Sequence, residues 1–362
     1  CAFCGALKST NPEKPKLQKC SGCFGARYCC VDHQKQHRKE HRAKCKEIAA
    51  KHEDMKKTAR LNEAWDAAVD CIRIGDIDGF KKVLDENVAQ LVNWGHDEHN
   101  GCTVLRASTE LARESFMSIL LERGADVNAQ SVLGVTALML ASRLGHPSCI
   151  SLLLDRGANV NAKNSYDGGT ALMKASQKGH PSCISVLLDR GANVDAKNND
   201  GVTALMIASN KEHPSCISLL LDRGADLNAK TNDGYTALMA ASQEGHSSCI
   251  SLLLERGADV NAKNNDGCTA LMIASQEGHR YCISLLLVRG SDVNAIANNG
   301  FTTATSLTKD PEIIRMLTRA RADKNNGRGG NGIRGNGSRG NGSRGNGRRG
   351  TNPVLDDDTI DW

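Results

Sequence analysis

One segment of about 33 residues recurs along most of this 362-residue chain. Each copy opens at a glycine, and the openings fall at Gly101, Gly134, Gly168, Gly201, Gly234, Gly267 and Gly300, at intervals of 33, 34, 33, 33, 33 and 33 residues. The one longer interval contains an extra residue within Asn164–Asp167. A period of this length indicates a stacked array, because so small a unit buries its apolar face only against its neighbours.

A single copy, residues 200–229, shows what each unit should form. Its sequence contains DGVTALMIAS, then PSCISLLL, then RGADLNA. This pattern predicts two short helices, each with one apolar face, and a turn between them. Gly224 follows the last leucine, where a helix end favours the left-handed conformation that glycine adopts easily. The sequence Asn199-Asp200-Gly201 predicts a tight turn of the kind that closes a β-hairpin.

These copies resemble the ankyrin repeat in their period, in the Gly-x-Thr-Ala-Leu opening, in the Gly-His between the helices and in the Leu-Leu-Leu-x-x-Gly-Ala-Asp-Val-Asn-Ala close. The resemblance covers residues 64–323 and implies a mainly α fold, a solenoid of helix pairs with short β-hairpins. Residues 64–100 are expected to form a divergent first cap, with helices over Ala64–Ile74 and Ile77–Leu84. Residues 300–323 are expected to form a truncated last unit.

The repeats depart from the family pattern at one place. Where the family usually has Thr-Pro-Leu-His, the chain has Thr-Ala-Leu-Met, as at Thr236–Met239. The resemblance then implies that the histidine hydrogen bonds between neighbouring turns are lost. Apolar packing should therefore carry more of the stacking.

Histidine and cysteine each recur once per repeat, at His146, His180, His213, His246 and His279, and at Cys149, Cys183, Cys216, Cys249 and Cys282. A ladder of metal sites or of disulfides is one interpretation of these columns. Equivalent positions in stacked helices lie roughly 8–10 Å apart, whereas a disulfide needs Cα atoms within about 7 Å. We therefore interpret the cysteines as small buried residues and the histidines as part of the turn between the helices.

The first 45 residues carry a different chemistry. They contain four pairs of residues with metal-ligand spacing, which are Cys1 and Cys4, Cys20 and Cys23, Cys29 and His33, and His41 and Cys45. Two intervening residues let one tight turn bring two thiolates to one ion, and three place two ligands one helical turn apart. A structural zinc takes four Cys or His ligands, so these eight candidates predict two zinc ions. The spacing alone leaves open which pairs share an ion.

Residues 1–45 resemble the MYND-type zinc finger, through Tyr28-Cys29, Gln34 and the intervals to His41 and Cys45. The resemblance implies an interleaved cross-brace, whose ligand sets are Cys1, Cys4, Cys29 and His33 for one zinc, and Cys20, Cys23, His41 and Cys45 for the other. His33 stands where the family normally has cysteine, and we interpret the spare candidates Cys30 and His37 as non-ligands. Arg38 stands at the family's usual tryptophan, near a surface that holds proline-rich peptides in some members. The resemblance therefore leaves open whether this finger binds a peptide.

Charge differs between the parts of the chain. Residues 1–60 carry 15 basic and 6 acidic residues, 61–323 carry 24 and 31, 324–350 carry 7 and none, and 351–362 carry four aspartates. Residues 46–63 lack glycine and proline and are expected to form a helical linker. Residues 324–362 are expected to form a disordered tail with an acidic end, because they are rich in Arg, Gly and Asn and poor in apolar residues. The arginine and glycine content resembles RGG-type tails that contact RNA, and a solvated linker is the alternative interpretation.

These features together predict a protein-interaction adaptor without catalytic activity. The repeats contain no nucleophile–base pair, phosphate loop or carboxylate dyad, so the array is expected to hold a partner protein and the zinc to be structural. The alternative is a nucleic-acid-associated protein that uses the basic finger region and the Arg/Gly tail. No hydrophobic run approaches the roughly 20 residues of a membrane helix. The placement of the cysteines favours an intracellular, reducing compartment, cytoplasm or nucleus, and the first residue, Cys1, leaves open what precedes it.

Partner-specific information should lie where the repeats differ. Lys174 stands where other units have apolar residues such as Ile207 and Ala240, and Tyr235 and Phe301 are the aromatic residues next to the opening glycines. Aromatic anchors often dominate binding energy, so these two are candidate contacts for a partner. The alternative is that both pack only against the neighbouring hairpin.

Overall fold

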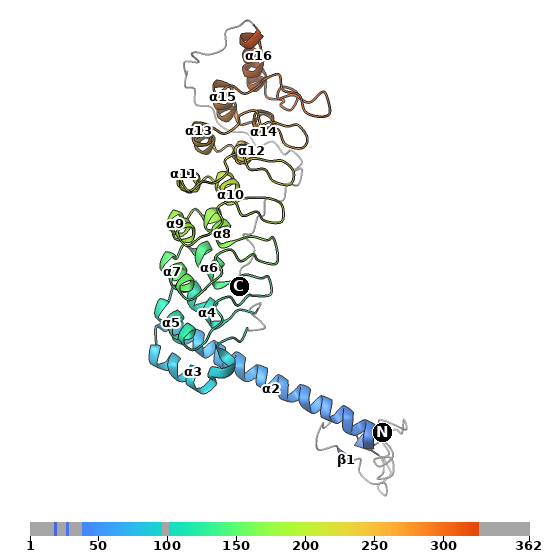
Figure 1. Cartoon of the computed structure of the whole chain (residues 1–362). Helices are drawn as coiled ribbons and strands as arrows, with labels where there is room; N and C mark the ends of the chain where they lie inside the picture. The colour runs from blue at the N-terminus through green and yellow to red at the C-terminus, as the bar shows by residue number, and fades with distance from the viewer. Residues whose placement is uncertain (1–17, 20–26, 29–37, 96–100, 326–362) are drawn as a thin grey trace. The chain divides into compact units, whose positions relative to one another are not determined.

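The computed structural model describes residues 18–19, 27–28, 38–95 and 101–325 (Figure 1), with the backbone alone described at 18–19, 27–28, 38–49, 52 and 87–90. The chain divides into two compact units, Cys1–Trp94 and Gly95–Trp362. In the first unit β1 (Gln18–Lys19) pairs antiparallel with β2 (Arg27–Tyr28), and α2 (Arg38–Ile74) is followed by α3 (Ile77–Leu91). No helix in the described ranges is both long and apolar enough to cross a membrane.

Helices α2 and α3 pack on each other through a small apolar core. Trp65, Ile72, Phe80 and Leu84 are buried there. The turn between the helices forms because Gly75 adopts a left-handed conformation, with φ of 81°, in which α2 can end. Asp76 then caps α3, since its side chain accepts a hydrogen bond of 2.9 Å from the backbone N–H of Gly79.

The expected helical linker and the expected first helix of the cap are one continuous helix. Residues 38–74 contain neither glycine nor proline, so nothing in the sequence ends α2 before Gly75. The second helix of the cap also continues past Leu84 and ends at Leu91.

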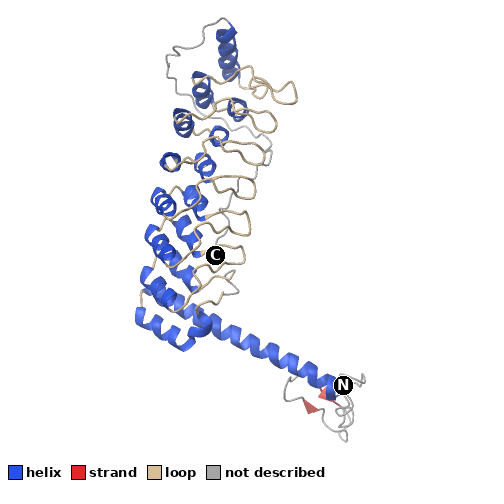
Figure 2. Cartoon of the chain, in the orientation of Figure 1, coloured by secondary structure: helices blue, strands red, loops and turns tan. Residues whose placement is uncertain are grey.

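The second unit is a stack of helix pairs (Figure 1). The first helix of each pair, which we call the inner helix, is α4 (Val104–Glu110), α6 (Ala137–Leu144), α8 (Ala171–Lys178), α10 (Ala204–Asn210), α12 (Ala237–Glu244) or α14 (Ala270–Glu277). The outer helices are α5 (Glu114–Glu122), α7 (Pro147–Asp155), α9 (Pro181–Asp189), α11 (Pro214–Asp222), α13 (Ser247–Glu255) and α15 (Arg280–Val288). Each inner helix packs on the next inner helix and each outer helix on the next outer one. The long loops between repeats all extend to one side, next to the inner helices (Figure 2).

Local sequence explains why the helices begin where they do. A threonine precedes every inner helix, and its hydroxyl accepts a hydrogen bond from the N–H three residues on, as Thr136 does from Met139. Proline occupies the first turn of three outer helices, as at Pro147, where its missing N–H leaves no bond unmade. Leu138, Ile150 and Leu153 and their equivalents are buried in the core between the layers.

The loops are hairpin-like and join one repeat to the next. Gly134 donates to the carbonyl of Ser131 at 2.8 Å, which closes the tip, and no strand is assigned in the loops within residues 101–325. Five successive tips, from that of Leu133 to that of Asp266, each accept one backbone hydrogen bond from the next tip, as from Asn199 to Asp167 at 2.9 Å and from Asn232 to Asp200 at 2.9 Å. These bonds fix the register of successive repeats.

Histidine supplies a second bond between repeats. The Nε2 atom of His180 lies 3.0 Å from the carbonyl oxygen of Arg143 in the preceding repeat, and it is the donor because a carbonyl only accepts. His213, His246 and His279 make the same contact with Gln177, Asn210 and Gln243. The family's usual histidine position is methionine here, so these bonds come from a different histidine, that of the Gly-His turn, and they add to the apolar packing that was expected to carry the stacking.

The last unit keeps only its outer helix. Residues 301–310 form turns, and α16 (Pro311–Asn325) packs on α15. The segment Thr302-Thr303-Ala304-Thr305-Ser306 is rich in residues that favour helix weakly, which explains the missing inner helix. An ion pair connects α15 to the residue before α16, because the guanidinium of Arg280 lies 2.6 Å from the carboxylate of Asp310.

Two residues adopt the left-handed backbone at a cost. Ala112 (φ of 51°) and Glu212 (φ of 58°) occupy the turn position that is Gly145 or Gly179 in other repeats. We expect Ala112→Gly to raise the free energy of unfolding by about 0.5–1 kcal/mol, because relief of the left-handed strain exceeds the added entropy of the unfolded chain. Urea unfolding measures the change.

The matched control is Ala158→Gly, at a position with an ordinary backbone conformation. This change should lower the free energy of unfolding, since it adds entropy to the unfolded chain and relieves no strain. Loss of stability in Ala112→Gly as well would contradict the account of this turn.

Candidate functional site

Most of the predicted zinc ligands lie outside the described residues. This holds for Cys1, Cys4, Cys20, Cys23, Cys29 and His33, and for the spare candidates Cys30 and His37. His41 and Cys45 lie in α2, where only the backbone is described. Within the described part of the chain, no group of three or more His, Cys, Asp or Glu side chains is placed to hold a metal.

The donor set nevertheless suits zinc. Six thiols and two imidazoles are the ligand types of structural zinc sites. The backbone of α2 places His41 and Cys45 four residues apart on one helix face, so both can reach one ion. β1 and β2 pair antiparallel with Gln18 opposite Tyr28 and Lys19 opposite Arg27.

The cysteine column of the array is part of the core. Cys149, Cys183, Cys216, Cys249 and Cys282 are all buried free thiols. Burial disfavours the thiolate and raises the pKa of Cys149, Cys183, Cys216 and Cys282 to about 11. A thiol of this kind is a poor nucleophile and a poor metal ligand at neutral pH, so these residues serve packing.

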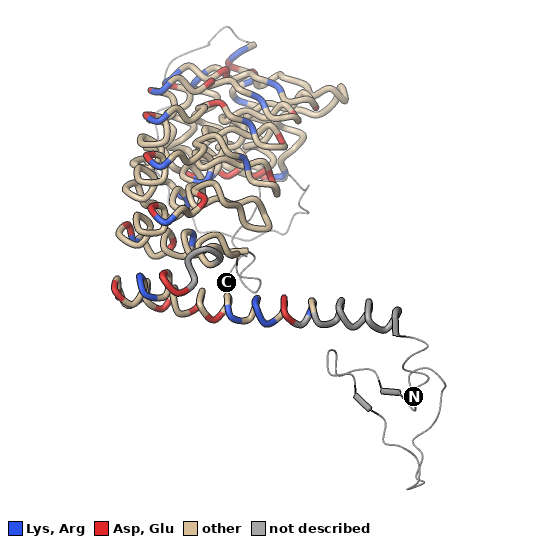
Figure 3. The backbone as a smooth tube through the Cα atoms, turned by 60° about the horizontal axis from the view of Figure 1, so that its bottom comes forward, with Lys and Arg blue, Asp and Glu red and all other residues tan. Residues whose placement is uncertain are grey.

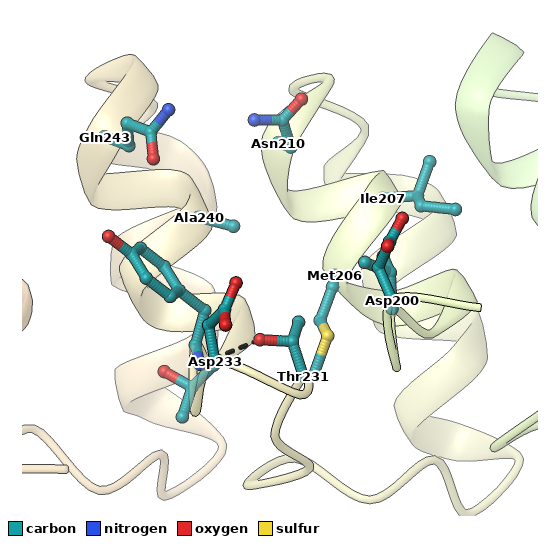
Figure 4. Close-up of a pocket in the computed structure, with 11 residues that line it drawn as sticks. Asp200, Met206, Ile207, Asn210, Thr231, Asp233, Ala240 and Gln243 are labelled. Carbon is teal, nitrogen blue, oxygen red and sulfur yellow. Dashed lines mark hydrogen bonds between the residues drawn. The ribbon is translucent and has the colours of Figure 1, made fainter. Parts of the chain in front are cut away.

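A second candidate site is the surface between the loop tips and the inner helices, which we call the inner face. It contains a cavity of about 60 Å³ between α10 and α12 (Figure 4). Its lining is Asp200, Val202, Met206, Ile207, Asn210, Thr231, Asp233, Tyr235, Thr236, Ala240 and Gln243. The volume suits an inserted side chain rather than a cofactor, and the lining contains no His, Cys, Lys or Arg.

The cavity has an apolar floor and a polar rim. Ile207 and Ala240 come from the inner helices, whereas Asp200 and Asp233 come from two successive tips, and all four border the same space (Figure 4). A hydrogen bond stabilises the tip, since the hydroxyl of Thr231 accepts from the N–H of Tyr235 at 3.0 Å. Such a surface can bind another molecule, because apolar side chains supply contact area and a few polar groups in defined positions supply hydrogen bonds.

Sequence reasoning did not single out the aspartates before the opening glycines as candidate contacts. Asp200 was considered only as part of a tight turn, and Asp233 and Asp266 were not considered. The available signal was their recurrence one per repeat at the position before the opening glycine. Neighbouring repeats bring two of them to one cavity, which the linear sequence does not show.

The two aromatic tip residues differ in exposure. Tyr235 is half-buried and lines the cavity, whereas Phe301 is 76% exposed. The alternative that both only pack on the neighbouring hairpin is therefore wrong for Phe301.

Lys174 forms an ion pair with the tip of its own repeat. Its Nζ lies 3.5 Å from Oδ2 of Asp167, and the side chains are 12% and 10% exposed. Asp167 also accepts a 2.8 Å hydrogen bond from the N–H of Gly169. Burial raises the pKa of Asp167, but Lys174 and the Gly169 N–H outweigh it and hold the pKa below its usual value. The repeat with the extra loop residue thus carries a structural ion pair where its neighbours carry apolar contacts.

Charged residues on the opposite side of the array form a ladder. Arg190 bonds to Asp155 at 2.6 Å, Arg223 to Asp189 at 2.6 Å and Arg256 to Asp222 at 2.7 Å. Basic and acidic residues accordingly lie together at the ends of successive outer helices (Figure 3). These pairs are largely exposed, so each contributes less than about 1 kcal/mol.

The family profile described as "Ankyrin repeats (3 copies)" matches residues 66–164, 160–231 and 225–297, and the profile described as "MYND finger" matches residues 1–45. No curated protein matches the chain.

Many solved structures resemble the chain, and two ankyrin repeat domains are examples. The human ASB11 ankyrin repeat domain is 25% identical, with a TM-score of 0.55, over 60% of this chain and 96% of that one. The ankyrin repeat domain of Bcl-3, described as a unique member of the IkappaB protein family, is 30% identical, with a TM-score of 0.54, over 60% of this chain and 99% of that one. The mainly helical solenoid expected from the sequence is confirmed.

The Asp167–Lys174 pair predicts an acid-dependent stability. The pKa of Asp167 is lower in the folded chain than in the unfolded one, so its contribution is present above the unfolded value and is lost as the pH falls below it. We expect Asp167→Asn to lower the free energy of unfolding by about 1–3 kcal/mol at pH 7, because the change removes the carboxylate that pairs with the largely buried charge of Lys174.

The difference between Asp167→Asn and the unchanged chain should shrink below about pH 4, where the unfolded carboxyl begins to take up a proton. Urea unfolding at pH 7, 5 and 3 measures it. The control is Asp233→Asn, which removes an exposed tip carboxylate that has no ion pair within the described residues. A difference as large at pH 3 as at pH 7 would contradict the assignment.

Proposed function

The chain belongs to the ankyrin repeat family and carries a MYND finger, and we propose that it is a non-catalytic adaptor whose inner face holds a partner protein. The cavity between α10 and α12 is the observation that carries the proposal. It presents apolar side chains, hydroxyls, amides and carboxylates, a mixture that suits contact with a side chain of a partner protein. The free thiols of the array favour a reducing compartment inside the cell.

Zinc is proposed to be structural and confined to the finger. A MYND finger binds zinc, and we propose two ions, one held by Cys1, Cys4, Cys29 and His33 and one by Cys20, Cys23, His41 and Cys45. The series of eight spaced Cys and His residues supports this proposal, because a structural zinc takes four such ligands. Zinc supplies a cross-link that a module of this size needs in order to fold.

The alternative function, nucleic-acid association through the basic finger region and the Arg/Gly tail, makes a different prediction about salt. Binding to phosphates weakens steeply as salt rises, whereas an interface with an apolar core depends on it less. The inner face favours the protein partner, because the carboxylates at the rim of the cavity would repel phosphates.

The finger should contain two zinc ions per chain, measured by elemental analysis. Cys20→Ser should abolish one site and unfold residues 1–45, while circular dichroism shows the helical signal of the array nearly unchanged.

His33→Ala should lower the zinc content and His37→Ala should not. One zinc or none in the unchanged chain, or the reverse result for the two histidines, would refute the ligand assignment.

Tyr235 should anchor the partner. We expect Tyr235→Ala to weaken binding by about 2 kcal/mol, roughly thirty-fold in Kd, because the change empties a buried aromatic contact. Titration calorimetry with a purified partner measures the change.

The matched control is Tyr281→Ala, which removes a tyrosine that is 67% exposed on the outer helix α15. This variant should bind as the unchanged chain does. Equal losses in both variants, or a partner that binds only through residues 1–45, would refute the inner-face proposal.

A further inference from the structure

The inner face is acidic toward its C-terminal end. Asp233 and Asp266 are exposed tip residues and Asp200 is half-exposed, while Glu244 and Glu277 are exposed at the ends of α12 and α14. Glu244 lies beside the cavity, because its carboxylate accepts hydrogen bonds from Asn210 at 3.2 Å and from Gln243 at 3.4 Å. Within residues 38–95 and 101–325, none of these five carboxylates forms an ion pair.

This pattern differs from the outer side of the array. There, Asp155, Asp189 and Asp222 are each neutralised by an arginine of the next repeat. The same repeat sequence thus pairs its outer carboxylates and leaves its inner ones without a cation. This surface is complementary to a segment with arginine side chains and many glycines. The arginines can form charge-assisted hydrogen bonds with the carboxylates, and the glycines let the backbone approach the apolar side chains.

The charge of the inner face reverses toward its N-terminal end. Arg143 occupies the position of Asn210 and Gln243, and Lys178 and Lys211 occupy that of Glu244 and Glu277. Lys174 adds a further cation in this part, although Asp167 is its partner. From the last repeat backward, the inner face therefore changes from acidic to basic.

The C-terminal tail carries the complementary charges in the matching order. It follows α16, which ends at Asn325 and packs on α15 beside the acidic repeats. Residues 326–350 contain six arginines and no acidic residue, and residues 356–361 contain four aspartates. A tail that runs back along the inner face would meet the acidic part with its arginines and the basic part with its aspartates.

The tail is long enough to do so. The 24 residues from 326 to 349 span roughly 80 Å when extended, and a flexible glycine-rich chain of this length spans about 25–30 Å on average. Neighbouring repeats lie about 8–10 Å apart, so Asp266 and Asp200 are separated by about 20 Å. Attachment to α16 also gives the tail a local concentration of the order of millimolar, which an unlinked peptide lacks.

We propose that residues 326–350 dock on the acidic part of the inner face of the same chain and cover the cavity between α10 and α12. Arginine guanidinium groups bind Asp200, Asp233, Asp266 and Glu244, and the glycines let the tail backbone lie close to the apolar floor. The aspartates of residues 356–361 lie toward Arg143 and Lys178. The tail is thus a cis-acting competitor for the partner, and this regulatory role rests on the proposed function of the inner face.

The rate of trypsin cleavage measures how accessible the tail is, because trypsin cleaves after arginine. In the full chain at low salt, cleavage after Arg334, Arg339 and Arg344 should be slow. It should be several-fold faster in the double variant Asp233→Asn/Asp266→Asn, and faster in the unchanged chain at high salt, where screening shortens the range of these attractions. Mass spectrometry of the released peptides measures the rates.

The matched control is Asp189→Asn/Asp222→Asn, which removes the same charge from the outer side of the array. Its tail should be cleaved as slowly as that of the unchanged chain. Thermal unfolding by circular dichroism establishes that both double variants remain folded. Equal cleavage rates in the unchanged chain and the inner-face variant would overturn the proposal.

A reciprocal measurement uses a residue of the inner face. Cys268 is a half-buried thiol at the tip beside Asp266, in the column of Val202 and Tyr235. Replacement of the six tail arginines by glutamine should speed its alkylation by iodoacetamide several-fold and leave alkylation of Cys71 in α2 unchanged.

Unchanged alkylation of Cys268 would overturn the proposal. So would an effect that grows with protein concentration, because the occupant would then be the tail of a second copy. No partner protein is present in either measurement. Failure of tail docking would therefore leave the adaptor function standing, and loss of partner binding would leave tail docking standing.

Discussion

Every part of the array depends on the contact between one repeat and the next. A pair of helices with seven to nine residues each has an apolar face that it cannot bury alone. The structure buries that face through the leucine, isoleucine and cysteine columns, and it fixes the register with two directional bonds. One joins the backbones of successive tips, as between Asn232 and Asp200, and the other joins His180 to the carbonyl of Arg143. Apolar burial supplies the driving force, and the hydrogen bonds decide how the repeats align.

Because the stack is held by these few positions, the side chains at exposed positions of the inner face can differ from one repeat to the next. The positions that hold the stack, such as the capping threonines and the buried leucines, are nearly identical in each unit. The positions next to the tips and on the exposed side of the inner helices differ, and they set the charge and shape of the inner face. Lys174, Tyr235 and Phe301 are examples, with three different environments in three repeats. A regular scaffold therefore presents an irregular recognition surface.

The sequence predicted the repeating architecture well, because period and glycine placement are local signals. Gly224 adopts the left-handed backbone expected of it, with φ of 85°. The sequence did not predict the inter-repeat bond of His180, nor that Asp200 and Asp233 line the same cavity. Both features depend on which residues of successive repeats become neighbours, and the linear sequence does not give that register. The length of α2 was missed for another reason, because the family resemblance suggested a boundary near residue 64 that the local sequence does not contain. The ligand assignment in residues 1–45 remains a prediction.

Hydrogen exchange of the complex with a purified partner tests the central claim, that the inner face is where a partner is held. The account predicts slower exchange at the loop tips and in the inner helices α10 and α12 when the partner is bound. The outer helices α11 and α13, which belong to the same repeats, should exchange as they do in the free chain. Slowed exchange confined to the outer helices, or to the finger, would contradict the account.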